Sequence, residues 1–156
     1  MALLEIMLAG APVLRANAEK VTRFDKKLGK LLDNMAETMY AAEGCGLAAP
    51  QIGLSKRIIV IDAGKGIQEF INPVFKFKEG SCTNVEGCLS VPDYEGEVER
   101  AEFVGVEYKD RKGNTKYVEA DGLLAIALQH ETDHLDGILF IDKASVIMPK
   151  EKEEQQ

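Results

Sequence analysis

The sequence predicts an α+β fold in which the strands pair in antiparallel fashion. A helical pattern near the start and a second one near the end enclose a long middle region of short β-branched runs. Turn-forming residues separate these runs from one another. Because the helices lie at the two ends and not between successive strands, antiparallel pairing is favoured over a wound βαβ fold.

Length and composition indicate an ordinary globular protein. The chain has 156 residues, of which 46% are hydrophobic and 29% charged, and this length suits a single core. Residues 1–156 are therefore expected to form one domain, with a short polar tail over about 148–156. The net charge of −7 argues against direct DNA binding and against anionic membranes, both of which attract basic surfaces. No stretch reaches the 18 apolar residues of a membrane span.

The N-terminal segment and the cysteines indicate a reducing compartment. The segment MALLEIMLAGAPVLR contains Glu5 and lacks a basic region before its apolar run, so it is expected to pack against the protein and not to act as a signal peptide. Cysteines occur at three positions, and an odd number without an export signal argues against a disulfide framework. The three are Cys45, Cys82 and Cys88.

The first half of the chain predicts one helix and one hairpin. Apolar residues at three- and four-residue spacing predict an amphipathic helix over Phe24–Ala42, followed by the small-residue loop AAEGCGLAAPQIG. The runs RIIVIDA and IQEFINP then flank the turn Gly64-Lys65-Gly66 and predict a hairpin. A phosphate-binding P-loop is excluded there, because Lys65 is followed by glycine and the upstream glycine spacing fails. The apolar helix positions are Leu28, Leu31, Leu32, Met35, Met39 and Tyr40.

The second half predicts several short strands and a final helix. From Val74 to Ala120 the strands are expected to be broken at EGS, PDYEG and DRKGN, with EFVGVEYKD and KYVEA forming a second hairpin around the last break. Asp121 suits the N-cap of the following helix, and Gly137 stands where that helix is expected to end.

The two histidines of the chain suggest a metal site on the final helix. His130 and His134 are four residues apart, so their rings share one face with Ile126. Glu131 follows directly, where its carboxylate can reach a water bound to an ion. The alternative is an accidental pair of core or surface histidines, but two buried rings without a metal both need hydrogen-bond partners. The metal site is therefore the favoured interpretation.

The third ligand is expected upstream of the histidines. Metzincin-type peptidases place a third histidine six residues after the second, and this position is Phe140. Thermolysin-like peptidases use a glutamate on a later helix, but Glu151, Glu153 and Glu154 stand too near the last residue for a supporting element to form. A cysteine or an upstream carboxylate must then complete the three protein ligands that zinc-type sites need.

The cysteines differ in their local surroundings. Cys88 lies in VEGCLSVPDYEG, where glycine and proline indicate a strand edge or tight turn. Cys82 lies at a turn or strand start, and Cys45 lies in the glycine-rich loop. Each cysteine taken alone is more often a small buried hydrophobic residue than a ligand. These surroundings do not decide among the three.

Three segments together resemble the signature motifs of the peptide deformylase family. They are GCGLAAPQIG over 44–53, EGCLS over 86–90 and QHETDHL over 129–135, in the order and at the separations of that family. The similarity extends from GAPVLR near the start to LFIDK near the end. It implies antiparallel β-sheets packed around a central helix that carries the His-Glu-x-x-His motif. It also implies removal of the formyl group from N-formylmethionyl nascent peptides, with release of formate.

The resemblance also implies roles for individual residues. Glu131 becomes the catalytic carboxylate, with the Gln51 side chain and the Leu89 N–H as oxyanion donors. The implied metal ligands are Cys88, His130 and His134. The candidates for substrate binding are Gly46, Cys45, Leu123, Ile126 and Ala127, for which ordinary loop structure or core packing is the alternative. Cys82 is expected to be structural, and a reactive thiol at Cys45 is the less favoured alternative to pocket lining.

Cofactor, partners and location follow from the same resemblance. One divalent ion per chain is expected, with Fe²⁺ implied by the family and Zn²⁺, Ni²⁺ or Co²⁺ also compatible with a thiolate and two imidazoles. A cytoplasmic location and transient contact with the ribosome are implied, although the basic C-terminal docking helix of some members is missing. Glu86 is expected either to support the metal site or to pair with Arg100. A small metallopeptidase and a non-catalytic structural zinc module remain alternatives.

Overall fold

A computed structural model of the chain describes residues 3–150. Its helices are α1 (Lys26–Ala41), α2 (Gly122–Leu135) and α3 (Phe140–Lys143), with 3₁₀-helices η1 (Pro12–Arg15) and η2 (Ala49–Ile52). Its strands are β1 (Gly46–Ala48), β2 (Ile58–Asp62), β3 (Ile67–Glu79), β4 (Cys82–Cys88), β5 (Val91–Arg100), β6 (Phe103–Lys109), β7 (Thr115–Ala120) and β8 (Val146–Pro149). No helix within 3–150 is long and apolar enough to cross a membrane.

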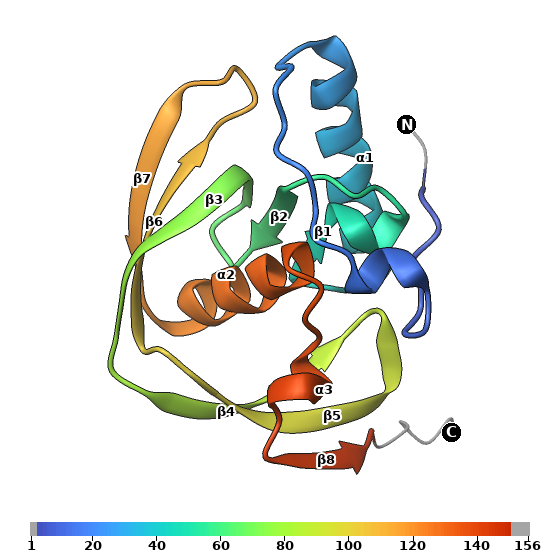
Figure 1. Cartoon of the computed structure of the whole chain (residues 1–156), viewed down its shortest axis with the longest axis vertical. Coiled ribbons are helices and arrows are strands. Elements are labelled where there is room, and N and C mark those ends of the chain that lie inside the picture. Colours follow the sequence, from blue (N-terminus) through green and yellow to red (C-terminus); the bar gives the residue numbers. More distant parts are fainter. Residues whose placement is uncertain (1–2, 151–156) are drawn as a thin grey trace.

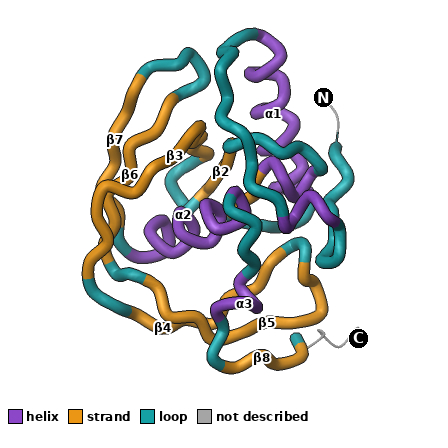
Figure 2. Tube along the Cα trace, viewed as in Figure 1, coloured by secondary structure: helices purple, strands orange, loops and turns teal. Residues whose placement is uncertain are grey.

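The strands form two antiparallel sheets, which confirms the predicted fold class. One sheet has the order β1-β2-β3-β6-β7 and the other the order β4-β5-β8. Figure 1 shows α2 between them, with α1 on the far side of the larger sheet. The chain passes directly from one sheet to the other from β3 to β4 and from β5 to β6, and these two passages run together along one side of the molecule (Figure 2). There Glu102 N donates to Glu79 O at 3.0 Å. A third passage, from β7 to β8, runs through α2 and α3.

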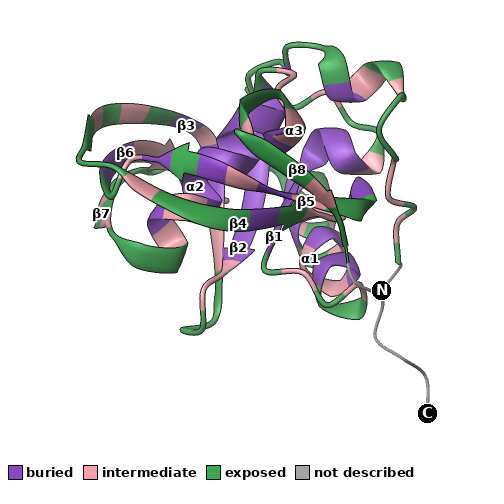
Figure 3. Cartoon of the chain, turned by 90° about the horizontal axis from the view of Figure 1, so that it is seen from below, coloured by how far each residue is buried: buried purple, intermediate pink, exposed green. Residues whose placement is uncertain are grey.

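Strand β2 forms the centre of the core, because helices cover both of its faces. Ile59 and Ile61 pack towards α2, whereas Ile58 and Val60 pack towards α1, and all four side chains are fully buried. A strand covered on both faces is apolar at every position, and this accounts for the run IIVI. Figure 3 shows the buried residues concentrated in α2 and the central strands.

Helix α1 is close to its predicted range. Asp25 is its N-cap, and the carboxylate accepts from Leu28 N at 3.1 Å, so Phe24 lies outside the helix. The predicted apolar face is correct except at Tyr40, which is 49% exposed and donates its hydroxyl to Asp62 Oδ2. Burial of Leu28, Leu32, Met35 and Met39 against β2 holds the helix on the sheet.

Both predicted hairpins are confirmed, but one predicted break between strands is wrong. The break at EGS lies between β3 and β4 and that at DRKGN lies between β6 and β7, whereas PDYEG lies inside β5. The tight turn in this region is the two-residue connection Leu89-Ser90, which follows the last residue of β4. Strand β8 includes Met148 and Pro149, the first residues of the segment expected to be a tail, while 151–156 lie outside the described residues.

Helix α2 is buried over its second half, and neighbouring residues define its C-terminal end. Every residue from Leu128 to Leu135 is buried. Asp121 stands at the N-cap as predicted, although its side chain makes no capping hydrogen bond. At the other end Arg57 donates to Leu135 O at 3.1 Å, a favourable place for a cation. Gly137 has a φ of 76°, and a Cβ there would lie 2.6 Å from Arg15 O, so only glycine fits after the helix.

Candidate metal centre

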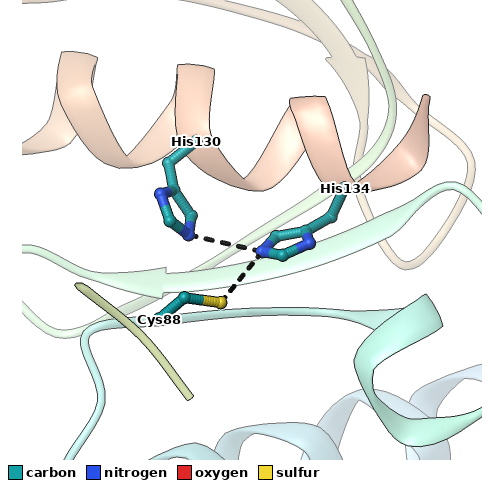
Figure 4. Close-up of side chains that lie close together, drawn as sticks. All are labelled: Cys88, His130 and His134. Atoms are coloured by element: carbon teal, nitrogen blue, oxygen red, sulfur yellow. Dashed lines mark hydrogen bonds between the residues drawn. The ribbon is translucent and has the colours of Figure 1, made fainter. Parts of the chain in front are cut away.

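Three side chains from distant parts of the chain converge between β4 and α2. Cys88 is the last residue of β4, whereas His130 and His134 stand on successive turns of α2. Potential ligand atoms of the three lie within 4.8 Å of one another. Figure 4 shows the sulfur and the two rings pointing toward a common point. The structure therefore brings together the three residues that the motifs suggested, and among the cysteines it places Cys88 in this group.

The spacing of these atoms suits a tetrahedral ion. His130 Nε2 lies 3.3 Å from His134 Nε2, and Cys88 Sγ lies 3.4 Å from His134 Nε2. With metal–nitrogen distances of about 2.0–2.1 Å, two nitrogen ligands at the tetrahedral angle are about 3.3–3.4 Å apart. The donor set of one sulfur and two imidazole nitrogens leaves a fourth position for a water or substrate. The residues present thus fit a divalent ion of the zinc or ferrous type.

A carboxylate fixes the orientation of the first histidine. His130 Nδ1 lies 2.8 Å from Glu86 Oε1. Burial alone raises the pKa of Glu86, but the hydrogen bonds from Arg100 and His130 outweigh it and lower the pKa to about 2. The ionised carboxylate accepts a hydrogen bond from Nδ1–H, so the Nε2 lone pair points toward the sulfur and the second ring. Both roles considered for Glu86 are therefore combined, because it contacts a ring and also pairs with Arg100.

The Glu86 carboxylate belongs to a buried ionic network. Arg100 Nε and Nη2 donate to Glu86 Oε2 and Oε1 at 2.9 and 2.8 Å, and Nη1 donates to Asp133 Oδ2 at 2.6 Å. Lys143 Nζ also reaches Asp133 Oδ1, at 3.2 Å. The Arg100 side chain is only 2% exposed. Arg100 on β5 thus ties Glu86 on β4 to Asp133 on α2 and sets the distance between the elements that carry the three ligands.

Glu131 faces the group of three from the side. Its Oε2 lies 3.9 Å from His130 Nε2 and its Oε1 lies 4.0 Å from His134 Nε2. Within residues 3–150 the buried Oε1 atom has no hydrogen-bond partner. Burial raises the pKa of Glu131 to about 7, against the opposing effect of His130. A buried carboxylate oxygen without a partner is unusual and indicates a position prepared for a polar group from outside the chain.

Two neighbours donate hydrogen bonds to the cysteine sulfur. Gln51 Nε2 lies 3.5 Å and Ser90 N lies 3.4 Å from Cys88 Sγ. Gln51 is held in place, because its Oε1 accepts from Ala48 N at 2.9 Å and its Nε2 donates to Ser90 Oγ at 3.2 Å. Donors directed at the sulfur stabilise its negatively charged form, which is the form that binds a metal.

The glycine-rich loop approaches the site closely. A Cβ on Gly46 would lie 2.7 Å from Glu131 Oε2, and one on Gly44 would lie 2.8 Å from Leu89 Cδ1. Leu89 itself is in the β4–β5 turn next to Cys88. Glycine at 44 and 46 therefore lets this loop lie against both the carboxylate and the turn.

The remaining candidate residues lie at varying distances from this group. Leu123 is 52% exposed, so the core packing considered for it is wrong, whereas Ile126 is half-buried and Ala127 packs in the core between α2 and the larger sheet. Cys45 precedes β1 and is exposed; desolvation of its thiol and then the charge of Glu131 raise the thiol pKa, which favours the protonated form. Cys82 is the first residue of β4 and is half-buried.

The position at which metzincin-type peptidases carry a third histidine ligand is occupied here by an aromatic side chain. Phe140 stacks on His130, with ring centroids 6.2 Å apart and an interplanar angle of 22°. Phe140 is also fully buried against β5 in the small core of the second sheet. The downstream carboxylates Glu151, Glu153 and Glu154 lie outside the described residues. The contacts of Asp133 with Arg100 and of Ser90 with Gln51 and Cys88 were not predicted from the sequence. For Asp133 a signal was present, because a charged residue on a helix that is expected to be buried needs a partner.

Comparison with known proteins identifies close similarity to one family over nearly the whole chain. The sequence model of polypeptide deformylase matches residues 3–150. The peptide deformylase of Heliobacterium modesticaldum is 52% identical over 151 residues, which cover 97% of this chain and 100% of that protein. The crystal structure of peptide deformylase from Thermotoga maritima superimposes with a TM-score of 0.92 at 41% identity, covering 94% of this chain and 100% of that one. The crystal structure of a peptide deformylase from Synechococcus elongatus in complex with actinonin superimposes with a TM-score of 0.89 at 44% identity, covering 92% of this chain and 79% of that one.

Proposed function

The chain belongs to the polypeptide deformylase family and is a hydrolase that removes the N-terminal formyl group from nascent polypeptides; we propose that Cys88, His130 and His134 hold the divalent ion of this reaction. The observation that carries this assignment is the convergence of the three donor atoms within 4.8 Å. The unpartnered Glu131 Oε1 beside them supports a catalytic site over a structural one, because a closed structural site needs no such carboxylate.

Glu131 is the group that moves protons. When bound, the ion lowers the pKa of water from about 15.7 to about 7 and polarises a carbonyl. Glu131 accepts a proton from the attacking water and returns it to the amine that leaves as formate is released. Burial raises the pKa of this carboxylate and makes it a stronger base, which suits it to both steps, since a general acid–base group works best when its pKa lies near the operating pH. The gap of 3.9–4.0 Å between its oxygens and the histidine nitrogens leaves room for a water.

Gln51 and Leu89 supply donors to the developing oxyanion. The Gln51 amide is anchored through Oε1 on Ala48 N, so its position is set before substrate arrives. Gln51 Nε2 donates two hydrogen bonds, and the one to Cys88 Sγ, at 3.5 Å, is the weaker. The N–H group of this weaker bond is the one that turns to the substrate. The backbone N–H of Leu89, in the turn beside Cys88, is the second donor. Fixed donors of this kind stabilise the transition state because they need no reorganisation.

The peptide substrate lies along β1 and the accessible N-terminal part of α2. In the described part of the chain β1 is an edge strand of the larger sheet, so an extended peptide can add to it. Gly46 allows close approach, and Cys45, Leu123, Ile126 and Ala127 surround the methionine side chain. Of these, Cys45 and Leu123 are exposed and Ile126 is half-buried, so these three have surface available for this contact, whereas Ala127 is buried. A formyl carbonyl carries only hydrogen, so a narrow site accepts it and rejects ordinary peptide bonds.

We further propose Fe²⁺ as the physiological ion, with Zn²⁺, Ni²⁺ and Co²⁺ as replacements that the same donors accept. Residues 1–156 act as one catalytic domain in the cytoplasm. Contact with the ribosome is transient, since the nascent chain is the substrate.

The direct test measures formate release from a formyl-Met peptide by protein prepared without oxygen, with the bound metal quantified. Release of formate by metal-loaded protein is the expected result. Cleavage of internal peptide bonds in unformylated peptides, with no formate, supports the metallopeptidase alternative instead. Full metal content without either activity supports the structural zinc module.

Metal removal separates a catalytic ion from a structural one. Chelation is expected to abolish formate release and to leave the far-ultraviolet circular dichroism spectrum unchanged. The protein stays folded because the cores on both sides of β2, and not the ion, stabilise the fold. Re-addition of Fe²⁺ is expected to restore activity. Unfolding on chelation contradicts this prediction, since structural sites supply folding energy directly.

Substitution of Gly46 is expected to act through Glu131. In Gly46→Ala the new Cβ would lie 2.7 Å from Glu131 Oε2 and displaces the carboxylate. Misplacement by about 1 Å commonly costs on the order of 10²-fold in rate, and kcat for formate release is expected to fall by this order with metal content unchanged. Gly87→Ala, where no atom lies within 4 Å of the new Cβ, is the matched control. Equal effects of the two substitutions contradict the explanation.

A further inference from the structure

We propose that a basic groove between the start of α1 and the β6–β7 turn binds a single-stranded segment of RNA. The groove has a volume of about 670 Å³, and four cations and two aspartates are among its lining residues, which are Phe24, Asp25, Lys26, Gly29, Lys30, Asp33, Asn34, Arg111 and Lys112. Figure 1 shows the β6–β7 turn beside the first turns of α1, at the end of the molecule away from β4 and β5. The choice of RNA as the partner rests on the proposed function, whereas the presence of an anion-binding surface does not.

Positive charge is concentrated beside this groove in an acidic protein. The segment 20–30, KVTRFDKKLGK, holds five cations and one acid, a net charge of +4 within a chain of −7. The remaining residues therefore carry −11. The single acid, Asp25, is the N-cap of α1. The overall charge, which argues against nucleic-acid binding by the surface as a whole, thus does not describe this region.

Fold stability does not explain the placement of these cations. Lys26 and Lys27 occupy the first turn of α1, which contains no acidic residue, and cations at this end of a helix oppose its dipole. Among the described residues, Lys26, Lys30 and Lys112 have no ion-pair partner, whereas Arg111 is held by Glu69 and Asp33 at 2.5 and 2.9 Å. Three free ammonium groups therefore face the groove beside one arginine fixed in its wall.

The shape and lining of the groove favour a strand over other anionic partners. A groove that tracks a phosphate backbone with cations is the usual electrostatic design for single-stranded nucleic acid. Phe24, the aromatic residue in the lining, is half-buried and packs against the core beside α1 and against the turn at Gly113, so the cations carry this site. A flat anionic bilayer contacts cations that protrude from a surface, whereas the cations here line a groove, and this favours a strand over a membrane. Nascent polypeptides emerge from a particle rich in RNA, so RNA is the strand that this enzyme encounters.

The test compares two charge-matched triple variants by fluorescence anisotropy. The probe is a labelled RNA of about 12 nucleotides, within the usual site size. The groove variant is Lys26→Glu/Lys30→Glu/Lys112→Glu, and the control is Lys56→Glu/Lys65→Glu/Lys150→Glu, in which three exposed lysines elsewhere are reversed. The groove variant is expected to lose at least about tenfold in affinity, and the control much less. With three phosphate contacts, wild-type affinity is expected to fall about 20-fold between about 50 and about 200 mM salt.

Several outcomes overturn the proposal. They are absence of RNA binding by the wild type at about 50 mM salt, equal losses in the two variants, and binding to phosphatidylserine vesicles in preference to RNA. Formate release from a short formyl-Met peptide is measured in parallel and is expected to be the same in both variants and the wild type. Since that assay contains no RNA, failure of the RNA proposal and failure of the catalytic proposal are read separately.

Discussion

Replacement of Glu131 by glutamine is expected to lower kcat for formate release by about 10²–10⁴-fold while the metal stays bound. Positioned acid–base groups contribute rate factors of this size, and the amide keeps the shape of the carboxylate but accepts no proton. Glu131 is not among the three convergent donors, so the ion is expected to remain. Steady-state kinetics on a formyl-Met peptide, with metal quantified in each sample, checks both parts.

The control for this substitution is Glu119→Gln, which changes an exposed glutamate on β7 in the same way. It is expected to leave kcat and metal content unchanged. If Glu131→Gln loses the ion together with activity, the carboxylate holds the metal and its assignment as the proton carrier fails. If it keeps full activity, another group accepts the proton.

Local pattern was sufficient to predict the two main helices and the two hairpins. Helix geometry alone predicts that His130 and His134 share one face and that the helix ends before Gly137. Both predictions are confirmed, since α2 contains both histidines and ends at Leu135. The two-sided burial of β2 explains why IIVI shows no alternation. By contrast, PDYEG contains the turn formers Pro, Asp and Gly but lies within β5, because pairing with β4 and β8 outweighs local preference.

The site itself could be predicted only in part from local pattern. Helical spacing gave the two histidines, but Cys88 reaches them through the β4–β5 hairpin, and no sequence spacing encodes that approach. The resemblance of three motifs was needed to choose it. The role of Asp133 was missed because its partner, Arg100, lies 33 residues away on another element. Leu123 followed the apolar periodicity of α2 yet is 52% exposed, although Leu124 and Ala125 beside it pack against the larger sheet.

The buried ionic network gives the largest expected effect on stability. Removing one member of a buried charge group leaves its partners unpaired, which typically costs about 3–5 kcal/mol. Arg100→Met is expected to lower the free energy of unfolding by this amount, because both Glu86 and Asp133 then lose their main cation. Chemical denaturation monitored by circular dichroism measures the loss.

Arg111→Met is the control that isolates burial, since Arg111 also pairs with two carboxylates, Glu69 and Asp33, but is 38% exposed. Exposed pairs contribute about 0–1 kcal/mol, so this variant is expected to be nearly as stable as the wild type. Arg100→Met is also expected to bind metal more weakly even where it is folded, because Glu86 no longer holds His130 in place. Equal destabilisation by the two substitutions, with unchanged metal affinity, would mean that Arg100 neither stabilises the fold through burial nor positions the ligands.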